Sequence, residues 1–214
     1  RSSDLLVGGN KFTDVAANRW SAGYVDYCAT TGVVAGIGNG QFNPTGSLTA
    51  LQFGKMLLVC LGYDADSEGL TGADWQINTS KLMTSAKLLK GLDSVKATDV
   101  ITREQAAQMM LNALKAPTVE YTTKGSSISV NGAEINLGAS EPTYVTNTIA
   151  KQQTISDATL TNNGGYTIEL GEKLYTKLKL SSGAMDDFGR PIHIWTNDTK
   201  KIGEYAEDED AKYT

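Results

Sequence analysis

Arg103 is the residue of this sequence best suited to bind a ligand. It follows Thr102 at the expected first turn of a helix, where backbone N–H groups have no partner within the helix. A planar guanidinium beside such N–H groups suits a carboxylate, because side-chain charge and helix dipole then act at one spot. An ion pair with Glu104 or another surface acid is the competing interpretation of the same residue. The pattern therefore predicts either an anion-binding site or a surface salt bridge.

The other chemically versatile residues do not form a catalytic pattern. Asp186 and Asp187 are adjacent, which splays their side chains, whereas a glycosidase pair must flank one sugar bond. The triplet of Asp187, Phe188 and Gly189 lacks the remaining kinase motifs. His193 is the single histidine, which excludes histidine-cluster zinc sites and leaves a histidine-dependent triad without a second candidate. We therefore expect a structural turn at Asp186 and no enzyme in this chain.

An acidic stretch imitates the start of a calcium-binding loop. Asp64, Asp66 and Glu68 have the required spacing, but the twelfth position counted from Asp64 is Trp75 instead of a bidentate Glu. We interpret the stretch as a solvated linker, and the sequence predicts no metal and no cofactor.

Composition limits the classes of partner. The 214 residues are 40% hydrophobic and 20% charged, which is ordinary for a globular protein with a sizeable core. The net charge of -5 and the lack of a Lys and Arg cluster argue against nucleic acid and anionic membranes. No run of eighteen apolar residues occurs, so we expect no membrane span, and the start RSSDLL resembles a mature or cut end.

One helix is expected on each side of a glycine-marked loop at 32–44. The first leads from Trp20 to Gly32, with a face at three- and four-residue steps that we expect to be buried: Tyr24, Tyr27, Cys28 and Thr31. The second begins at a cap, Ser47 or Thr49, and carries an apolar stripe of Phe53, Met56, Leu57, Cys60 and Leu61. Cys28 and Cys60 could lie close together as core thiols, with a disulfide as the alternative.

The helix pair is repeated. Trp20 stands 16 residues before Gly36, and Trp75 stands 16 before Gly91, so the two units are offset by 55. Past the loop the offset falls to 53, which pairs Met56 with Met109. The second pair is expected from about Trp75 to Leu89 and from Thr102 to Leu114, with Asp99 or Thr102 as the cap of the last helix.

These units resemble the S-layer homology repeat, whose pattern runs F-x-D-V, Trp, G-I-x-x-G, x-G-x-F-x-P and T-R-A-E. The second unit keeps Trp75, Gly91 and the run from Thr102 to Gln105, but it lacks the start and the loop, and neither unit is complete. In the first unit Ala50 replaces the arginine. The first unit matches the pattern at Phe12, Asp14, Val15, Trp20, Gly32, Val33, Gly36, Gly40, Phe42, Pro44 and Thr49.

The resemblance implies a function and a site. The family usually carries three repeats around a pseudo-threefold axis, and a third copy is expected upstream. Its members anchor surface proteins noncovalently to the cell wall by binding an acidic, often pyruvylated, secondary polysaccharide attached to peptidoglycan. By this resemblance Arg103, with Thr102 and Glu104, belongs to the groove that binds the glycan, and Trp20, Asp14 and Gly36 line or shape a neighbouring groove.

Structural interpretations of three of these residues remain open. Trp20 could be a core anchor, Asp14 a cap of the first helix, and Gly36 a residue needed for positive φ. Because Ala50 replaces the arginine in the first unit, at most one of the two visible grooves is expected to bind tightly.

The last part of the chain changes character after Val119. Thr, Ser, Gly and Asn increase, and alternating runs from Ser127 to Leu137 predict a hairpin around a turn at Asn131 and Gly132. The tight turn at 186–191 leads into a strand at 192–195, whereas 167–180 mixes helix and strand signals.

The sequence therefore predicts an α+β protein. Residues 1–118 are expected to hold two S-layer homology repeats, at about 12–62 and 70–116, and residues 119–214 a β-rich domain of unknown role. The predicted function is anchoring of an extracellular protein to the bacterial cell wall or S-layer. The alternative is a lattice or spacer module that contacts other S-layer subunits without binding glycan, and an enzyme would need catalytic residues outside this chain.

Overall fold

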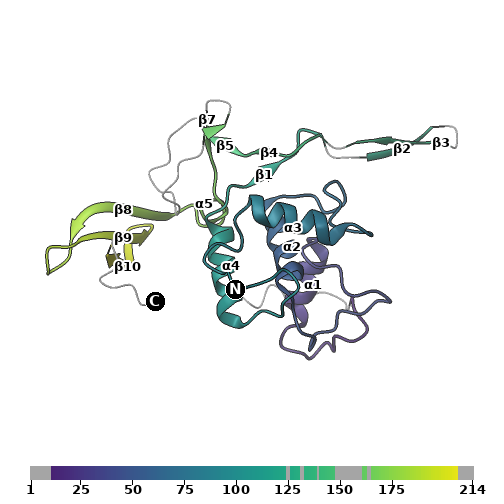
Figure 1. Cartoon of the computed structure of the whole chain (residues 1–214), viewed down its shortest axis with the longest axis horizontal. Coiled ribbons are helices and arrows are strands. Elements are labelled where there is room, and N and C mark those ends of the chain that lie inside the picture. The colour runs from purple at the N-terminus through teal and green to yellow at the C-terminus, as the bar shows by residue number, and fades with distance from the viewer. Residues whose placement is uncertain are drawn as a thin grey trace.

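The computed structural model describes residues 11–123, 126–130, 133–138, 140–147, 161–162 and 165–206. Within these ranges the chain forms five α-helices and ten short β-strands, so the fold is a mixture of α and β as expected (Figure 1). Four helices occupy the first half: α1 (Ala22–Thr30), α2 (Ala50–Leu61), α3 (Trp75–Ser85) and α4 (Arg103–Leu114). The described helices are all too short to cross a membrane as an apolar span.

Two equivalent capping boxes start α2 and α4. The Thr49 hydroxyl accepts from the Gln52 N–H at 3.3 Å, while the Gln52 side chain accepts from the Thr49 N–H at 2.9 Å. Thr102 and Gln105 repeat the arrangement at 3.2 and 2.8 Å. Each box satisfies a donor that the first helical turn leaves without an intrahelical partner. Of the caps considered from the sequence, Thr49 and Thr102 are the ones observed.

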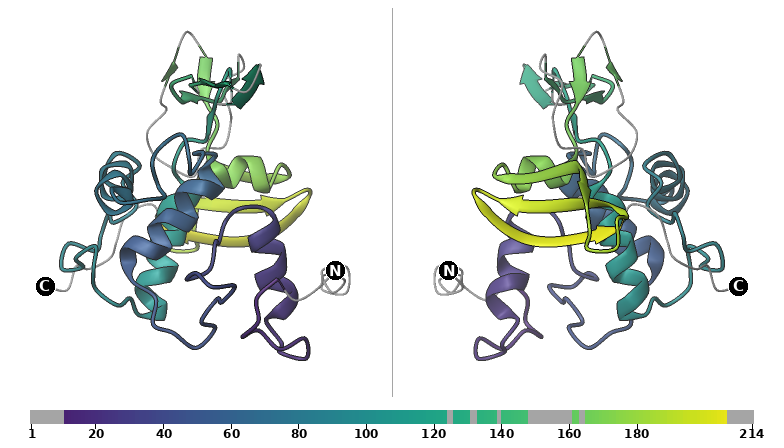
Figure 2. Two further views of the ribbon diagram at one scale, coloured as in Figure 1. Left: turned by 90° about the vertical axis from the view of Figure 1, so that its right-hand side faces the viewer. Right: turned by 90° about the vertical axis from the view of Figure 1, so that its left-hand side faces the viewer.

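The main core surrounds α2. Leu58 and Leu61 are fully buried, and Met83 from α3 and Met109 from α4 join them. Gly54 is in close contact with α3, because a Cβ atom at this position would lie 2.2 Å from the Met83 Sδ atom. Figure 2 shows α1 and α3 well apart, with α2 and α4 between them.

The prediction for the buried face of α1 is wrong except at Cys28, which is half-buried. Tyr24 and Tyr27 are 50% and 57% exposed, and Thr31 is also exposed. The residues that α1 buries are instead small: Ala22, Gly23, Val25 and Ala29. They pack in a separate cluster against the loop that precedes α1, where Phe12 and Val15 are buried and Phe42 lies 5.3 Å from the Phe12 ring. The periodicity of the sequence predicted a helix correctly, but it did not predict which face of that helix the segment before α1 covers.

The expected stripe of α2 is only partly correct. Leu57 and Leu61 are buried and Phe53 packs against the core, but Cys60 is exposed. The buried face of α2 also includes Leu51, Gly54 and Leu58, and Gly54 lies against Met83 of α3. Cys28 and Cys60 are both free thiols.

The acidic linker after α2 is held by a tyrosine. The Tyr121 hydroxyl donates to the Glu68 carboxylate at 2.7 Å and accepts from the Asp64 N–H at 3.1 Å. Burial and the neighbouring acids raise the pKa of Tyr121 above its ordinary value. Among the described residues no group of metal-ligating side chains gathers here or elsewhere. The linker is thus a docked turn rather than a fully solvated segment.

Short antiparallel pairs follow the helices. The hairpin of β2 (Ser126–Val130) and β3 (Ala133–Leu137) is confirmed, although its turn residues lie outside the described ranges. The strands β1 (Val119–Glu120) and β4 (Thr143–Tyr144) pair with each other, and β7 (Gly165–Thr167) pairs with β5 (Thr146–Asn147) and β6 (Thr161–Asn162).

The ambiguous stretch at 167–180 holds both kinds of element. It forms α5 (Leu170–Leu174) and then enters β8 (Leu178–Met185), which pairs with β9 (Pro191–Asn197) and, through it, with β10 (Lys200–Ala206). Val119 and Leu170 are buried in the core around α2, and the Leu170 N–H donates to the Ala116 carbonyl at 3.0 Å. The strand region is therefore attached to the helices at 116–119 and 168–171.

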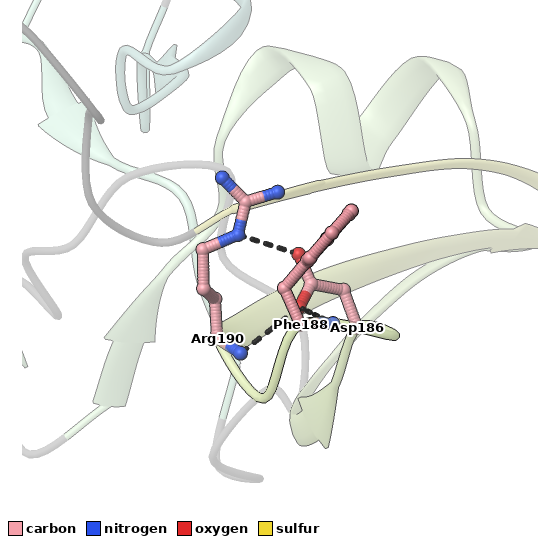
Figure 3. A network of polar contacts seen from close by, with 3 residues as sticks. All are labelled: Asp186, Phe188 and Arg190. Atoms are coloured by element: carbon pink, nitrogen blue, oxygen red, sulfur yellow. Dashed lines mark hydrogen bonds and ion pairs between the residues drawn. The ribbon is translucent and has the colours of Figure 1, made fainter.

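The expected turn at Asp186 is confirmed. Its carboxylate accepts from the N–H groups of Phe188 and Arg190, each at 2.9 Å, and from the Arg190 Nε at 2.7 Å (Figure 3). The Arg190 guanidinium lies 5.4 Å from the centre of the Phe188 ring. These hydrogen bonds, with the Arg190 charge, hold the pKa of Asp186 below its ordinary value. Asp186 thus closes the β8–β9 hairpin.

We predict that Leu58→Ala lowers the free energy of unfolding by about 3 kcal/mol, because it opens a cavity in the core around α2. Urea unfolding followed by circular dichroism measures the change. Met110→Ala on the exposed side of α4 is the control and should cost less than about 0.5 kcal/mol. Equal losses in the two variants would contradict the assigned core.

We also predict that Thr102→Ala lowers the free energy of unfolding by about 1 kcal/mol, since the capping box of α4 is lost. Thr102→Ser keeps the hydroxyl and should retain most of the stability. If Ser and Ala are equally harmful, the hydroxyl cap is not what Thr102 contributes.

Candidate functional site

A groove lies between the 33–48 loop, α2 and the start of α3. Its volume is about 770 Å³. Its walls combine apolar side chains with one cation, because the loop supplies Val33, Val34 and Ile37 and α2 supplies Lys55 and Met56. Residues 70–72 and Trp75 close the far side. We call this the first groove.

Lys55 is the charged centre of the first groove. Its ammonium lies 5.9 Å from the centre of the Trp75 ring, within the range of a cation–π contact. Burial lowers the pKa of the amino group, and Asp66 opposes this effect. A cation that has lost part of its hydration gains more from an incoming anion than a fully solvated one. The first groove therefore pairs an aromatic surface with a partly buried cation.

Gly36 shapes one wall of the first groove. Its φ of +78° lies in the left-handed region, and a Cβ atom would lie 2.5 Å from the Gln41 carbonyl oxygen and 2.6 Å from the Phe12 ring. Both conformation and space exclude a side chain, so Gly36 brings the loop backbone close to the preceding segment. The prediction of a positive φ at Gly36 is confirmed.

Asp14 fixes the 33–48 loop by hydrogen bonds to its backbone. Its carboxylate accepts from the N–H groups of Phe42 and Asn43 at 2.8 and 2.7 Å, and these bonds lower its pKa. Asp14 does not cap the first helix, because α1 begins after Ser21 and has no side-chain cap. The alternative interpretation as a helix cap is therefore wrong, and the carboxylate fixes the wall of the first groove.

Trp20 is exposed rather than a core anchor. Its side chain is 81% exposed and touches the Tyr24 ring, with centroids 6.4 Å apart. The equivalent Trp75 is partly buried and packs against the core around α2. The two tryptophans thus have different environments despite their equivalent places in the two units.

Arg103, Thr102 and Glu104 stand together at the start of α4. All three are exposed, and within the described part of the chain the Arg103 guanidinium makes no ion pair, with Glu104 or otherwise. Glu104 lines a second groove of about 510 Å³, which Gly91, Gln105, Gln108 and other residues complete. We call this the second groove.

The predicted site residues do not share one groove lining in the structure. Gly36 lines the first groove and Glu104 lines the second. The other predicted site residues belong to neither lining: Arg103, Thr102, Trp20 and Asp14. Sequence reasoning missed Lys55 and the role of Trp75 in the first groove. A signal was present, because Lys55 is the one basic residue between Thr49 and Gly62.

Comparison with known proteins identifies part of the chain. Residues 11–50 match the S-layer homology domain. A cell surface protein of Thermoanaerobacter kivui is 26% identical over 94% of this chain and 26% of its own length. No solved structure matches the chain significantly.

Two further relatives have cell-wall or glycan-related names. An endoglucanase of Bacillus sp. (strain KSM-635) is 28% identical over 65% of this chain and 15% of its own length. The middle cell wall protein of Brevibacillus brevis is 25% identical over 60% of this chain and 12% of its own length. The chain thus spans about a quarter or less of each relative. With the S-layer homology match at residues 11–50, these relatives identify the chain as part of an extracellular protein of the bacterial cell wall or S-layer.

Proposed function

We propose that this chain anchors its protein to the cell wall by binding an acidic secondary wall polysaccharide in the first groove. We further propose that the two helix pairs are S-layer homology repeats at 12–62 and 70–116, and that 119–214 is a β-rich domain with a separate role. The S-layer homology domain supports wall anchoring in general. The groove suggests the chemistry of the polymer.

Lys55 beside Trp75 is the observation that carries the proposal. A carboxylate such as that of a pyruvyl group gains from a cation that is partly desolvated, and the C–H face of a sugar ring can pack on the indole. The apolar wall at Val33 and Ile37 favours the methyl group of a pyruvyl ketal over a second charge. An acidic sugar that carries an apolar substituent therefore fits this groove better than a neutral glycan.

The residues assigned by the resemblance have complementary parts in this proposal. Arg103, with Thr102 and Glu104, forms a second contact for the polymer beside the second groove, where the guanidinium is available to an anion. Asp14 and Gly36 fix the loop that walls the first groove. Ala50 stands where the pattern has arginine, and Lys55 supplies a cation to the first groove instead.

Cosedimentation with purified bacterial cell walls tests the proposal. We predict that the chain binds intact walls and loses binding when the secondary polysaccharide is stripped. Lys55→Met keeps the aliphatic stem but removes the charge, and it should weaken binding about tenfold or more, as should Arg103→Ala. Lys115→Met at the other end of α4 is the matched control and should bind as the wild type does.

Two results would contradict the proposal. Equal binding to intact and stripped walls would exclude the secondary polysaccharide as the ligand. Binding to neither, by a folded chain, would favour the alternative of a lattice or spacer module in the S-layer. If Lys115→Met weakens binding as much as Lys55→Met, the interaction depends on net charge and not on the first groove.

A further inference from the structure

The turn that follows α2 forms one wall of the first groove. Residues 70–72 line the groove, and they continue the acidic stretch that begins at Asp64. The stretch folds back on itself, since backbone N–H groups at 68–70 donate to carbonyls at 64–66 over distances of 2.7 to 3.1 Å. We call residues 64–72 the acidic turn. Because these bonds join its two halves, the position of the groove wall depends on the position of the acidic half.

Asp66 links the acidic turn to the groove. Its carboxylate accepts from the hydroxyl of Thr71, a lining residue, at 3.1 Å. Its negative charge raises the pKa of Lys55, against the lowering that burial causes. Among the described residues, however, Lys55 makes no ion pair, with Asp66 or with any other acid. Asp66 thus lies close enough to act on the Lys55 charge without pairing with it.

Tyr121 fixes the acidic turn from the strand region. Its hydroxyl contacts the turn on both sides of Asp66, at the Asp64 N–H and at the Glu68 carboxylate. Tyr121 directly follows β1, whose Val119 is buried in the core around α2. A side chain attached to this core therefore holds the part of the turn that carries Asp66.

We propose that Tyr121 is a positioning residue of the first groove, which keeps Asp66 from pairing with Lys55. This role of Tyr121 rests on the function proposed above for the first groove. With the turn fixed, Asp66 stays bonded to Thr71, and the Lys55 ammonium is available to an anionic ligand. Without the Tyr121 hydroxyl, the Asp66 carboxylate can turn onto Lys55, because a partly desolvated cation attracts a nearby acid strongly. Asp66 then competes with the ligand carboxylate for the same cation.

The strand region thereby affects binding without touching the ligand. Among the described residues, none after Leu111 lines either groove. A displacement of residues 119–121 from the end of α2 would nevertheless release the acidic turn and block Lys55. Coupling of this kind is reciprocal, so an anion bound at Lys55 should also stabilise the attachment of Tyr121 to the turn.

The pKa of the Lys55 amine tests the arrangement without any ligand. NMR titration of the 214-residue chain with labelled lysine side chains measures it, and the absence of one resonance in Lys55→Met assigns the signal. In Tyr121→Phe the ion pair with Asp66 should raise the pKa of Lys55 by about half a pH unit. Adding Asp66→Asn to this variant should abolish the rise. Tyr175→Phe, which removes the hydroxyl of an exposed tyrosine, is the matched control and should leave the pKa unchanged.

Wall binding is the second readout. In cosedimentation with intact bacterial cell walls, Tyr121→Phe should bind about fivefold more weakly than the wild type. The double variant with Asp66→Asn should recover most of the lost affinity. A merely structural role of Tyr121 does not predict this recovery, since the double variant still lacks the hydroxyl. Circular dichroism verifies that each variant is folded.

Three results would overturn the proposal. The first is an unchanged pKa of Lys55 in Tyr121→Phe, and the second is a rise that persists after Asp66→Asn is added. The third is wall binding that is equally weak in Tyr121→Phe and in the double variant. A wild type that binds no wall overturns the function proposed for the first groove, whereas the pKa of Lys55 still decides whether Tyr121 positions Asp66.

Discussion

The close contact of α2 with α3 at Gly54 is the constraint on which the helical half depends. With no side chain at this position, the Met83 thioether enters the space that a Cβ atom would fill. The contact lets Leu58 and Leu61 become fully buried, and it joins α2 to the second helix pair in one core, while α1 packs in a separate cluster. Each pair alone would bury little apolar surface, so neither is expected to be stable without the other.

The same contact creates the first groove. Joining α3 to α2 brings Trp75 to within a cation–π distance of Lys55, and neither residue would form a binding surface alone. Asp14 and Gly36 then fix the facing loop by hydrogen bonds and by close backbone approach. The groove is therefore a product of the repeat, since one wall comes from each unit.

The sequence predicted the positions of the helices better than it predicted which face of each helix is buried. Helix-capping patterns located α2 and α4 correctly, because Thr49 and Thr102 act within a few residues of themselves. Periodicity failed for α1, where Tyr24 and Tyr27 are exposed and small residues face the loop. Lys55 was missed because a lone lysine becomes part of a site only when residues distant in the sequence surround it. The packing of Leu170 against the helical core was missed for the same reason, since it joins residues that are far apart in the sequence.

Mapping of a bound wall polysaccharide fragment by amide chemical shifts tests the central claim most directly. Titration of the isotope-labelled chain with an acidic fragment should shift resonances of the 33–48 loop and of the neighbourhood of Lys55 and Trp75. The same fragment with its carboxylates reduced to alcohols should shift them much less at equal concentration. Shifts confined to the strands after Val119, or equal shifts with the reduced fragment, would contradict glycan anchoring through the first groove.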